Sequence, residues 1–216
     1  MVTNLSDGNS LVSCWIREIR DTGIHGDRMR FRRNLERIGE VAAYEISRLL
    51  PYRQVAVQTP LGVSNCMVLE QQPVLATILR AGLPLHQGML NYFDGADCAF
   101  IGAYRRHSAD GSFDINQQYV ANPMPDGRPL IIADPMLATG ASLALALKTL
   151  TETGRPSQLH IVAAIGCKLG IDHILSSFPD AHIWVGAMDA ELTANAYLYP
   201  GLGDAGDLAF GEKQQR

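Results

Sequence analysis

The chain has 216 residues, of which 47% are hydrophobic and 19% are charged. A chain of this length and apolar content can bury a sizeable core, which excludes wholesale disorder and predicts a single domain over residues 1–216. Eighteen Lys and Arg against 22 Asp and Glu give a formal net charge of -4. This overall charge disfavours binding to nucleic acid, so any anion must be bound by a few local arginines and by backbone amides.

Targeting and metal-binding signals are absent from the sequence. Residues 1–13 lack a basic segment followed by an apolar one, and no run of 18 apolar residues occurs. We therefore expect neither secretion nor contact with a membrane. The cysteines form no CxxC motif and no zinc-ligand spacing, which predicts free thiols in the cytoplasm and no metal held by the protein itself; they are Cys14, Cys66, Cys98 and Cys167.

The first part of the chain predicts a helical arm over about residues 1–50, followed by a hairpin. Apolar residues recur at helical spacing over 28–50, and Pro51 ends the pattern. Two short β-like runs, Gln54–Gln58 and Cys66–Leu69, then flank a Pro-Leu-Gly turn, which is the pattern of a β-hairpin.

From residue 73 onward, apolar runs alternate with helical patterns. The runs cover 73–79, 98–103, 129–133, 159–165 and 182–187, and helical patterns follow at 83–93, 141–151 and 171–178. This alternation predicts an α/β protein with a mainly parallel sheet flanked by helices. Because such sheets bind ligands beyond the carboxyl ends of their strands, functional residues are expected after 79, 103, 133, 165 and 187.

Two stretches depart from this rhythm. Residues 105–128 are polar and contain Gly and Pro, which predicts an active-site flap, a projecting hairpin or disorder. The glycine-rich stretch Tyr199–Gly211 is expected to be irregular.

The segment Pro129–Ser142, PLIIADPMLATGAS, joins an apolar strand to an Ala/Leu-rich helix through a short turn. Backbone N–H groups at a helix N-terminus converge, and the helix dipole favours an anion there. Thr139 and Ser142 add hydroxyl donors, and Gly140 allows close approach of the backbone. The segment is neither a Walker A loop nor a GxGxxG motif, so by itself it fits a phosphate loop and an ordinary capped turn equally well.

Asp134 at the end of this apolar run also has two interpretations. Its carboxylate fits a turn or helix cap, or it accepts hydrogen bonds from the vicinal hydroxyls of a ribose. In the second role it would also stabilise positive charge that develops on a sugar ring.

Four segments in this order resemble a single family: ILRAGL (78–83), YR (104–105), DPMLATGAS (134–142) and YLYPGLGDAGDLAFG (197–211). Together they are similar to the uracil phosphoribosyltransferases, which are type I phosphoribosyltransferases that use phosphoribosyl pyrophosphate (PRPP). The resemblance covers roughly residues 17–211. It implies the type I phosphoribosyltransferase fold, with a β-rich hood and a mobile flap at about 105–128.

The resemblance also implies a set of site residues. Residues 134–142 would bind the ribose and 5-phosphate, two arginines would contact PRPP, and a C-terminal loop at about 197–211 would read uracil with backbone groups. The expected catalytic residues are Arg80, Arg105 and Asp204; the expected PRPP-binding residues are Arg80, Arg105, Asp134, Pro135, Met136, Leu137, Ala138, Thr139, Gly140, Ala141, Ser142 and Asp204; and the expected uracil-binding residues are Leu198, Gly203, Asp204 and Ala205.

The implied reaction joins uracil N1 to ribose C1 as pyrophosphate leaves, and gives UMP. Mg²⁺ would arrive bound to PRPP, so it requires few ligands from the protein. The resemblance further implies a homodimer or a higher homo-oligomer. Uracil and PRPP are then the expected small-molecule partners.

Three departures from the family pattern leave the flap and regulation open. Ala141 stands where a second glycine is usual, Arg106-His107-Ser108 follows the YR pair where acidic residues are common, and residues 166–170 replace an Ala/Ser-Pro-Glu-Gly stretch. The alternatives are a transferase for another base, an RNA-binding regulator with the same fold that senses nucleotides, and a non-catalytic subunit. The PGLGDAGD segment disfavours another base, and the acidic net charge disfavours the regulator.

Overall fold

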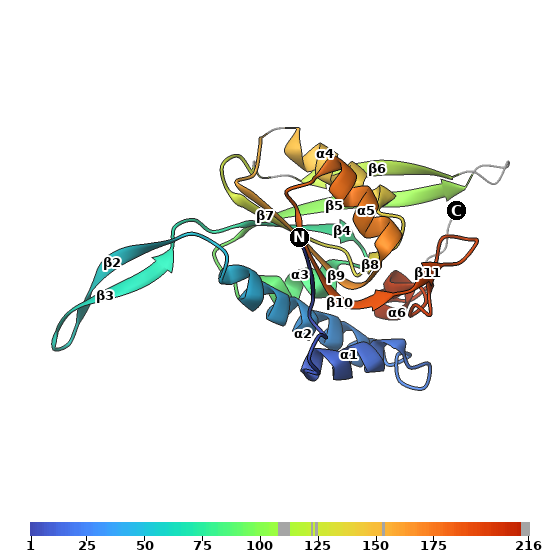
Figure 1. The fold of residues 1–216 in the computed structure, drawn as a ribbon, viewed down its shortest axis with the longest axis horizontal. Helices are drawn as coiled ribbons and strands as arrows, with labels where there is room; N and C mark the ends of the chain where they lie inside the picture. The colour runs from blue at the N-terminus through green and yellow to red at the C-terminus, as the bar shows by residue number, and fades with distance from the viewer. Residues whose placement is uncertain (108–112, 122, 124, 153, 213–216) are drawn as a thin grey trace.

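The computed structural model describes residues 1–107, 113–121, 123, 125–152 and 154–212, and within 103–107 and 113–120 only the backbone (Figure 1). In this part, eight strands form the main sheet. Their order is β1 (Val2–Asn4), β10 (His182–Asp189), β9 (Gln158–Cys167), β7 (Pro129–Ala133), β4 (Val74–Leu79), β5 (Asp97–His107) and β6 (Phe113–Ala121), with the short β8 (Met136–Leu137) also paired to β9. All of these pairs are parallel except β5 with β6, so the predicted α/β fold with a mainly parallel sheet is confirmed.

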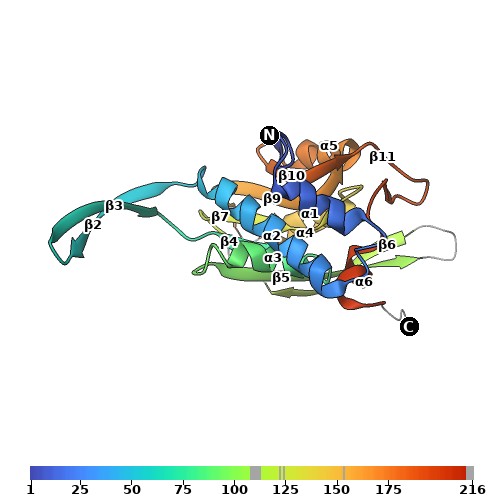
Figure 2. The ribbon, with the colours of Figure 1, turned by 90° about the horizontal axis from the view of Figure 1, so that it is seen from below.

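Helices cover both faces of this sheet. α1 (Leu11–Arg20), α2 (Arg28–Ser47) and α3 (Leu83–Leu90) lie on one face, and α4 (Ala141–Thr151) and α5 (Lys168–Ser177) lie on the other (Figures 1 and 2). Successive strand residues point to opposite faces, so Leu75 packs in the core under α1–α3 and Val74 in the core under α4 and α5. The central strands β4 and β7 are almost entirely apolar because both of their faces are buried.

The helical arm at the N-terminus contains one helix more than the sequence interpretation identified. α2 confirms the helix expected at 28–50, although it ends at Ser47. α1 precedes it, begins after Ser10, whose hydroxyl accepts from the N–H of Val12, and buries Val12, Ile16 and Ile19.

The predicted hairpin is confirmed and is longer than expected. β2 (Tyr52–Thr59) and β3 (Gly62–Leu69) form a two-stranded ribbon that projects from the body (Figure 1). Leu61 at its tip is fully exposed, and Val63 and Met67 are mostly exposed.

The two irregular stretches prove to contain regular structure. β5 continues past Ala103 to His107 and pairs with β6, so the described part of 105–128 forms a hairpin, and its role as an active-site flap stays a prediction. The expectation that 199–211 is irregular is wrong for α6 (Ala205–Phe210), which Asp204 caps. β11 (Glu191–Leu192) and β12 (Leu198–Tyr199) pair just before it. Among the described helices, none combines the length and the apolar character that crossing a bilayer requires.

Candidate functional site

The direction in which the chain progresses across the sheet reverses between β4 and β7. From β4 the chain passes through α3 to β5 on one side, and from β7 it passes through α4, β9 and α5 toward β10 on the other. Ligands in such sheets bind beyond the carboxyl ends of the strands at this switch point. The loops that start at Arg80 and at Asp134 therefore border the expected binding crevice.

The loop after β4 packs directly on the end of β7. Thr77 Oγ1 donates to the carbonyl of Ala133 at 3.2 Å. A Cβ added to Gly82 would lie 2.1 Å from Thr77 Oγ1 and 2.8 Å from the Ala133 oxygen. Only glycine fits this position, and its close approach brings the turn that carries Arg80 against the residue that precedes Asp134.

The segment at 134–142 has its carbonyls turned toward α5. The Cys167 thiol lies 3.2 Å from the Ala138 oxygen, and Nδ1 of His173 donates to the Thr139 oxygen at 2.7 Å. Because the C=O and N–H of a trans peptide point in opposite directions, the N–H groups of Thr139 and Gly140 point away from α5. Two adjacent amides directed to the same side at the start of α4 form an anion-binding arrangement.

Gly140 allows this arrangement. It has a φ of 77°, and a Cβ there would lie 2.9 Å from the Gly170 oxygen. Gly170 in turn has no room for a side chain, because its Cβ would lie 2.3 Å from the Ala138 oxygen. The turn is thus packed closely against α5 on the side that carries its carbonyls.

Arg80 joins this region to the C-terminal loop. Its Nη2 lies 3.0 Å from Asp207 Oδ1 and 3.3 Å from the Gly211 oxygen. Asp204 Oδ1 accepts from the N–H of Asp207 and so caps α6. The side chain of Arg80 is 39% exposed, which leaves its guanidinium accessible to a ligand.

The other predicted residues fall into three groups. The segment of Pro135, Met136 and Leu137 follows β7. The carbonyl oxygen of Pro135 and the pairing of β8 connect this segment to β9, and the Leu137 side chain lies in the core. Leu198 and Ala205 are buried, so only their backbone groups suit the expected role. The backbone of Arg105 lies in β5 opposite Ile115, but its side chain lies outside the described residues, and its role stays a prediction.

A pocket of about 290 Å³ adjoins the C-terminal loop. Two residues of the predicted set, Gly203 and Asp204, line it, together with His25 and Arg28 from the N-terminal part of the chain. Nδ1 of His25 is buried there without a hydrogen-bond partner among the described residues. Arg80 and the turn at 134–142 do not line this pocket, so it covers at most one edge of the site.

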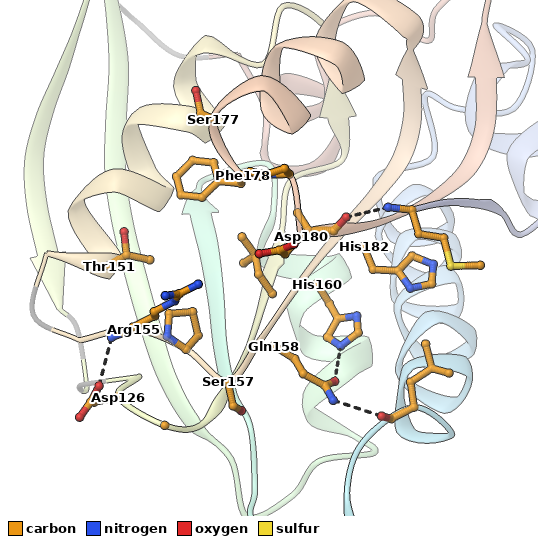
Figure 3. A pocket seen from close by; sticks show the side chains of 17 residues that line it. Asp126, Thr151, Arg155, Ser157, Gln158, His160, Ser177, Phe178, Asp180 and His182 are labelled. Atoms are coloured by element: carbon orange, nitrogen blue, oxygen red, sulfur yellow. Dashed lines mark hydrogen bonds between the residues drawn. The ribbon is translucent and has the colours of Figure 1, made fainter.

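A second, larger pocket of about 1080 Å³ lies at the opposite, amino-terminal ends of β7, β9 and β10 (Figure 3). None of the predicted site residues lines it. His160 stands at its inner wall, where Nδ1 accepts from the indole N–H of Trp184 at 3.3 Å. Nε2 therefore carries the proton and donates to Gln158 Oε1 at 3.0 Å, and Gln158 Nε2 donates to the Leu49 oxygen (Figure 3). The neutral ring is built into a chain of hydrogen bonds that ties β9 to the end of the N-terminal arm.

This arrangement predicts acid sensitivity. Burial is the larger cause, and the nearby charge of His182 the smaller one, that together lower the pKa of His160 to about 4. The folded protein thus favours the neutral ring. The stability that this ring contributes to the fold is fully present above about pH 6.5 and is lost as the pH falls toward 4. We expect a loss of about 3 kcal/mol from this residue, measurable by denaturant unfolding at pH 7 and pH 4. The His160→Gln variant should lose most of this difference, and an identical pH dependence in the variant would contradict the assignment.

Sequence reasoning missed several residues that organise the site. Arg20 and Asp189 both bind the backbone of Gly201, Arg32 donates to the Ala209 oxygen, and Asp207 pairs with Arg80. These partners lie far apart along the chain, and no local pattern marks their pairing. Cys167, expected only as a free thiol, and His173, which no motif includes, are the residues that hold the carbonyls of the turn.

Comparison with known proteins gives consistent matches. The model of the family "Uracil phosphoribosyltransferase" matches residues 7–212. A uracil phosphoribosyltransferase of Porphyromonas gingivalis is 48% identical over 213 residues, which cover 98% of this chain and 99% of that protein. One of Pyrobaculum arsenaticum is 39% identical over 183 residues, or 83% of this chain and 86% of that protein.

Solved structures match as well. A protein of Aquifex aeolicus superposes with a TM-score of 0.87 at 28% identity, and the match covers 98% of each chain. An adenine phosphoribosyltransferase of Trypanosoma brucei, solved with AMP, pyrophosphate and ribose-5-phosphate, has a TM-score of 0.58 at 9% identity over 90% of this chain and 86% of that one. The second likeness concerns the fold alone, and it is the type I phosphoribosyltransferase fold expected from the sequence.

Proposed function

Because this chain belongs to the uracil phosphoribosyltransferase family, we propose that it transfers ribose 5-phosphate from PRPP to N1 of uracil, giving UMP and pyrophosphate. The observation that carries the proposal is the position of Arg80. It lies between the turn at the end of β7 and the C-terminal segment 197–211, where it contacts Asp207 in α6 and the Gly211 oxygen directly after that helix. A cation at this junction can bind the pyrophosphate group of PRPP. The ribose of PRPP then extends toward one loop, and the acceptor base lies on the other.

The turn at 134–142 binds the 5-phosphate in this proposal. The outward N–H groups of Thr139 and Gly140 and the dipole of α4 favour a dianion. Ser142 adds a hydroxyl from the first turn of that helix. Asp134 at the end of β7 then accepts from the ribose hydroxyls and stabilises the positive charge that builds on the ribose ring as the bond to pyrophosphate lengthens.

Pyrophosphate carries the charge that must be neutralised as it leaves. Arg80 donates from a planar guanidinium, which suits bidentate binding of phosphate oxygens. Arg105, on β5 beside β4, supplies a second arginine from the neighbouring strand. No strong general base is needed, since positioning and charge stabilisation lower the barrier.

Uracil is read by main-chain groups of the loop that ends at α6. Leu198, Gly203 and Ala205 contribute backbone N–H and C=O groups that match the donors and acceptors of the base edge. Cytosine would present an amino group where the loop offers a donor, which leaves both groups unsatisfied. The site is therefore expected to prefer uracil over cytosine.

We also propose that Mg²⁺ enters with PRPP. Among the described residues, no three His, Cys, Asp or Glu side chains group together as a metal site. Arg80 lies beside the Asp207 carboxylate, and Asp204 caps the helix that carries Asp207. Carboxylate oxygens suit Mg²⁺, which commonly keeps several waters and binds through one or two such groups plus substrate phosphates. When bound, the ion would neutralise charge on the pyrophosphate.

The direct test is a product assay. Purified protein with labelled uracil, PRPP and Mg²⁺ should form UMP and pyrophosphate, and EDTA should abolish the product. Hypoxanthine, xanthine and cytosine in place of uracil should give no nucleotide. Product only with another base would replace uracil as the substrate, and RNA binding without any product would favour the regulator.

We propose a homo-oligomer in the cytoplasm, as expected from the family resemblance. The hairpin β2–β3 supports this, because Leu61, Val63 and Met67 are exposed on a ribbon that projects from the body. Exposed apolar side chains on a projecting element are typical of a subunit contact. The four cysteines are free thiols, which suits a reducing compartment. Light scattering should give a mass of at least two chains, and a monomeric mass would contradict the oligomer.

A further inference from the structure

Gly201, in the middle of the loop proposed to read uracil, has both of its backbone polar groups bound to one ion pair. Its N–H donates to Asp189 Oδ2 at 3.0 Å, and its carbonyl accepts from Arg20 Nη1 at 2.9 Å. The other nitrogen, Arg20 Nη2, lies 2.5 Å from Asp189 Oδ1. The arginine, the carboxylate and the peptide groups of Gly201 thus form a closed ring of hydrogen bonds, and we call Arg20 and Asp189 the Gly201 clamp.

The clamp is part of the rigid body of the protein. Asp189 is the last residue of β10, and Arg20 is the last residue of α1, which packs against β10 and α2. The Asp189 side chain is 1% exposed and that of Arg20 is 20% exposed. Charge-assisted hydrogen bonds are strong when they are shielded from water, so the clamp fixes the Gly201 backbone relative to the sheet.

The position of Gly201 determines where the neighbouring backbone groups lie. Gly201 has a φ of 67°, and a Cβ there would lie 2.3 Å from the Leu198 oxygen, so the chain folds back tightly at this point. Leu198 comes three residues before Gly201, and Gly203 comes two residues after it. A shift of the Gly201 peptide would therefore displace the groups that read the base on both sides.

We infer that Arg20 and Asp189 are positioning residues for uracil binding. They do not touch the base, but they hold in place the main-chain groups that do. Recognition by backbone depends strongly on such support, because a backbone group cannot adopt a new rotamer to recover a lost contact. This inference rests on the proposed function and adds to it the residues that set the affinity for the base.

Two conservative variants test the inference. Asp189→Asn keeps one oxygen acceptor but loses the charge that binds Arg20, and Arg20→Lys keeps the charge but replaces the planar fork with a single ammonium. The matched control is Arg17→Lys, on the same helix, where the side chain is 69% exposed and pairs with Asp21 at 3.8 Å. In each clamp variant we expect the KM for uracil to rise about tenfold to a hundredfold, while the KM for PRPP stays within about twofold. Arg17→Lys should leave both constants unchanged.

Hydrogen exchange gives a readout that does not depend on activity. In the clamp variants, amide exchange should accelerate in residues 198–205 and stay unchanged in α2 and β9. A fall of kcat with both KM values unchanged would show a loss of folded enzyme only, and would overturn the inference. So would an unchanged KM for uracil in both variants. If the wild-type protein made no UMP, the proposed function would fail, whereas an active wild type with unaffected variants would refute the clamp alone.

Discussion

Replacing Arg80 with alanine should reduce kcat/KM for PRPP about a hundredfold to a thousandfold, as expected when a group that stabilises transition-state charge is removed. The residue lies at the junction of the two proposed substrate loops, 3.0 Å from Asp207 and 39% exposed. A partly exposed ion pair contributes at most about 1 kcal/mol to stability, so the variant should remain folded. Steady-state kinetics and a thermal melt of the same preparation measure both effects.

Asp207→Asn separates the two possible roles of Arg80. This substitution removes the charge partner but leaves Arg80 and its contact with the Gly211 oxygen. If Arg80 binds pyrophosphate, Asp207→Asn should be far milder than Arg80→Ala. Equal loss of activity in both variants would mean that Arg80 acts only by holding α6 in place.

Replacing Gly88 with alanine should cause a large loss of stability. Gly88 on α3 faces α2, and a Cβ there would lie 1.9 Å from the Glu36 oxygen and 2.9 Å from the Glu40 nitrogen. Gly39 makes the reciprocal approach, because its Cβ would lie 2.2 Å from the Leu85 oxygen. Since these contacts are with backbone, no side-chain rotation relieves them and the helices must separate.

We expect a cost of about 3 kcal/mol for Gly88→Ala, toward the upper end for overpacked sites. For a chain of this size, that corresponds to a fall in Tm of roughly 6–12 °C. The control is Gly26→Ala, where the added Cβ would meet no atom within 4 Å. A Tm within about 2 °C of the wild type for Gly88→Ala would show that α2 and α3 can shift apart at little cost.

Local patterns predicted the elements with buried, regular sequences. The apolar runs at β4, β7, β9 and β10 and the helical pattern of α4 were located within one or two residues, because both faces of these strands are buried. α1 was missed although Val12, Ile16 and Ile19 follow helical spacing. β6 was anticipated only as one of three alternatives, because its polar residues resemble those of a loop. α6 was missed because glycine and aspartate outnumber alanine and leucine over the whole stretch 199–211.

The sequence by itself therefore determined the α/β class, the order of the loops and the two segments most specific to the family, since these depend on the periodicity and composition of short stretches. Only the tertiary structure decided which residues support those segments. Arg20 lies 169 positions from Asp189, and His173 lies 34 from Thr139, yet each pair meets through hydrogen bonds. Such contacts depend on how helices and strands pack together. The residues next to either partner in the sequence therefore show no pattern that predicts the contact.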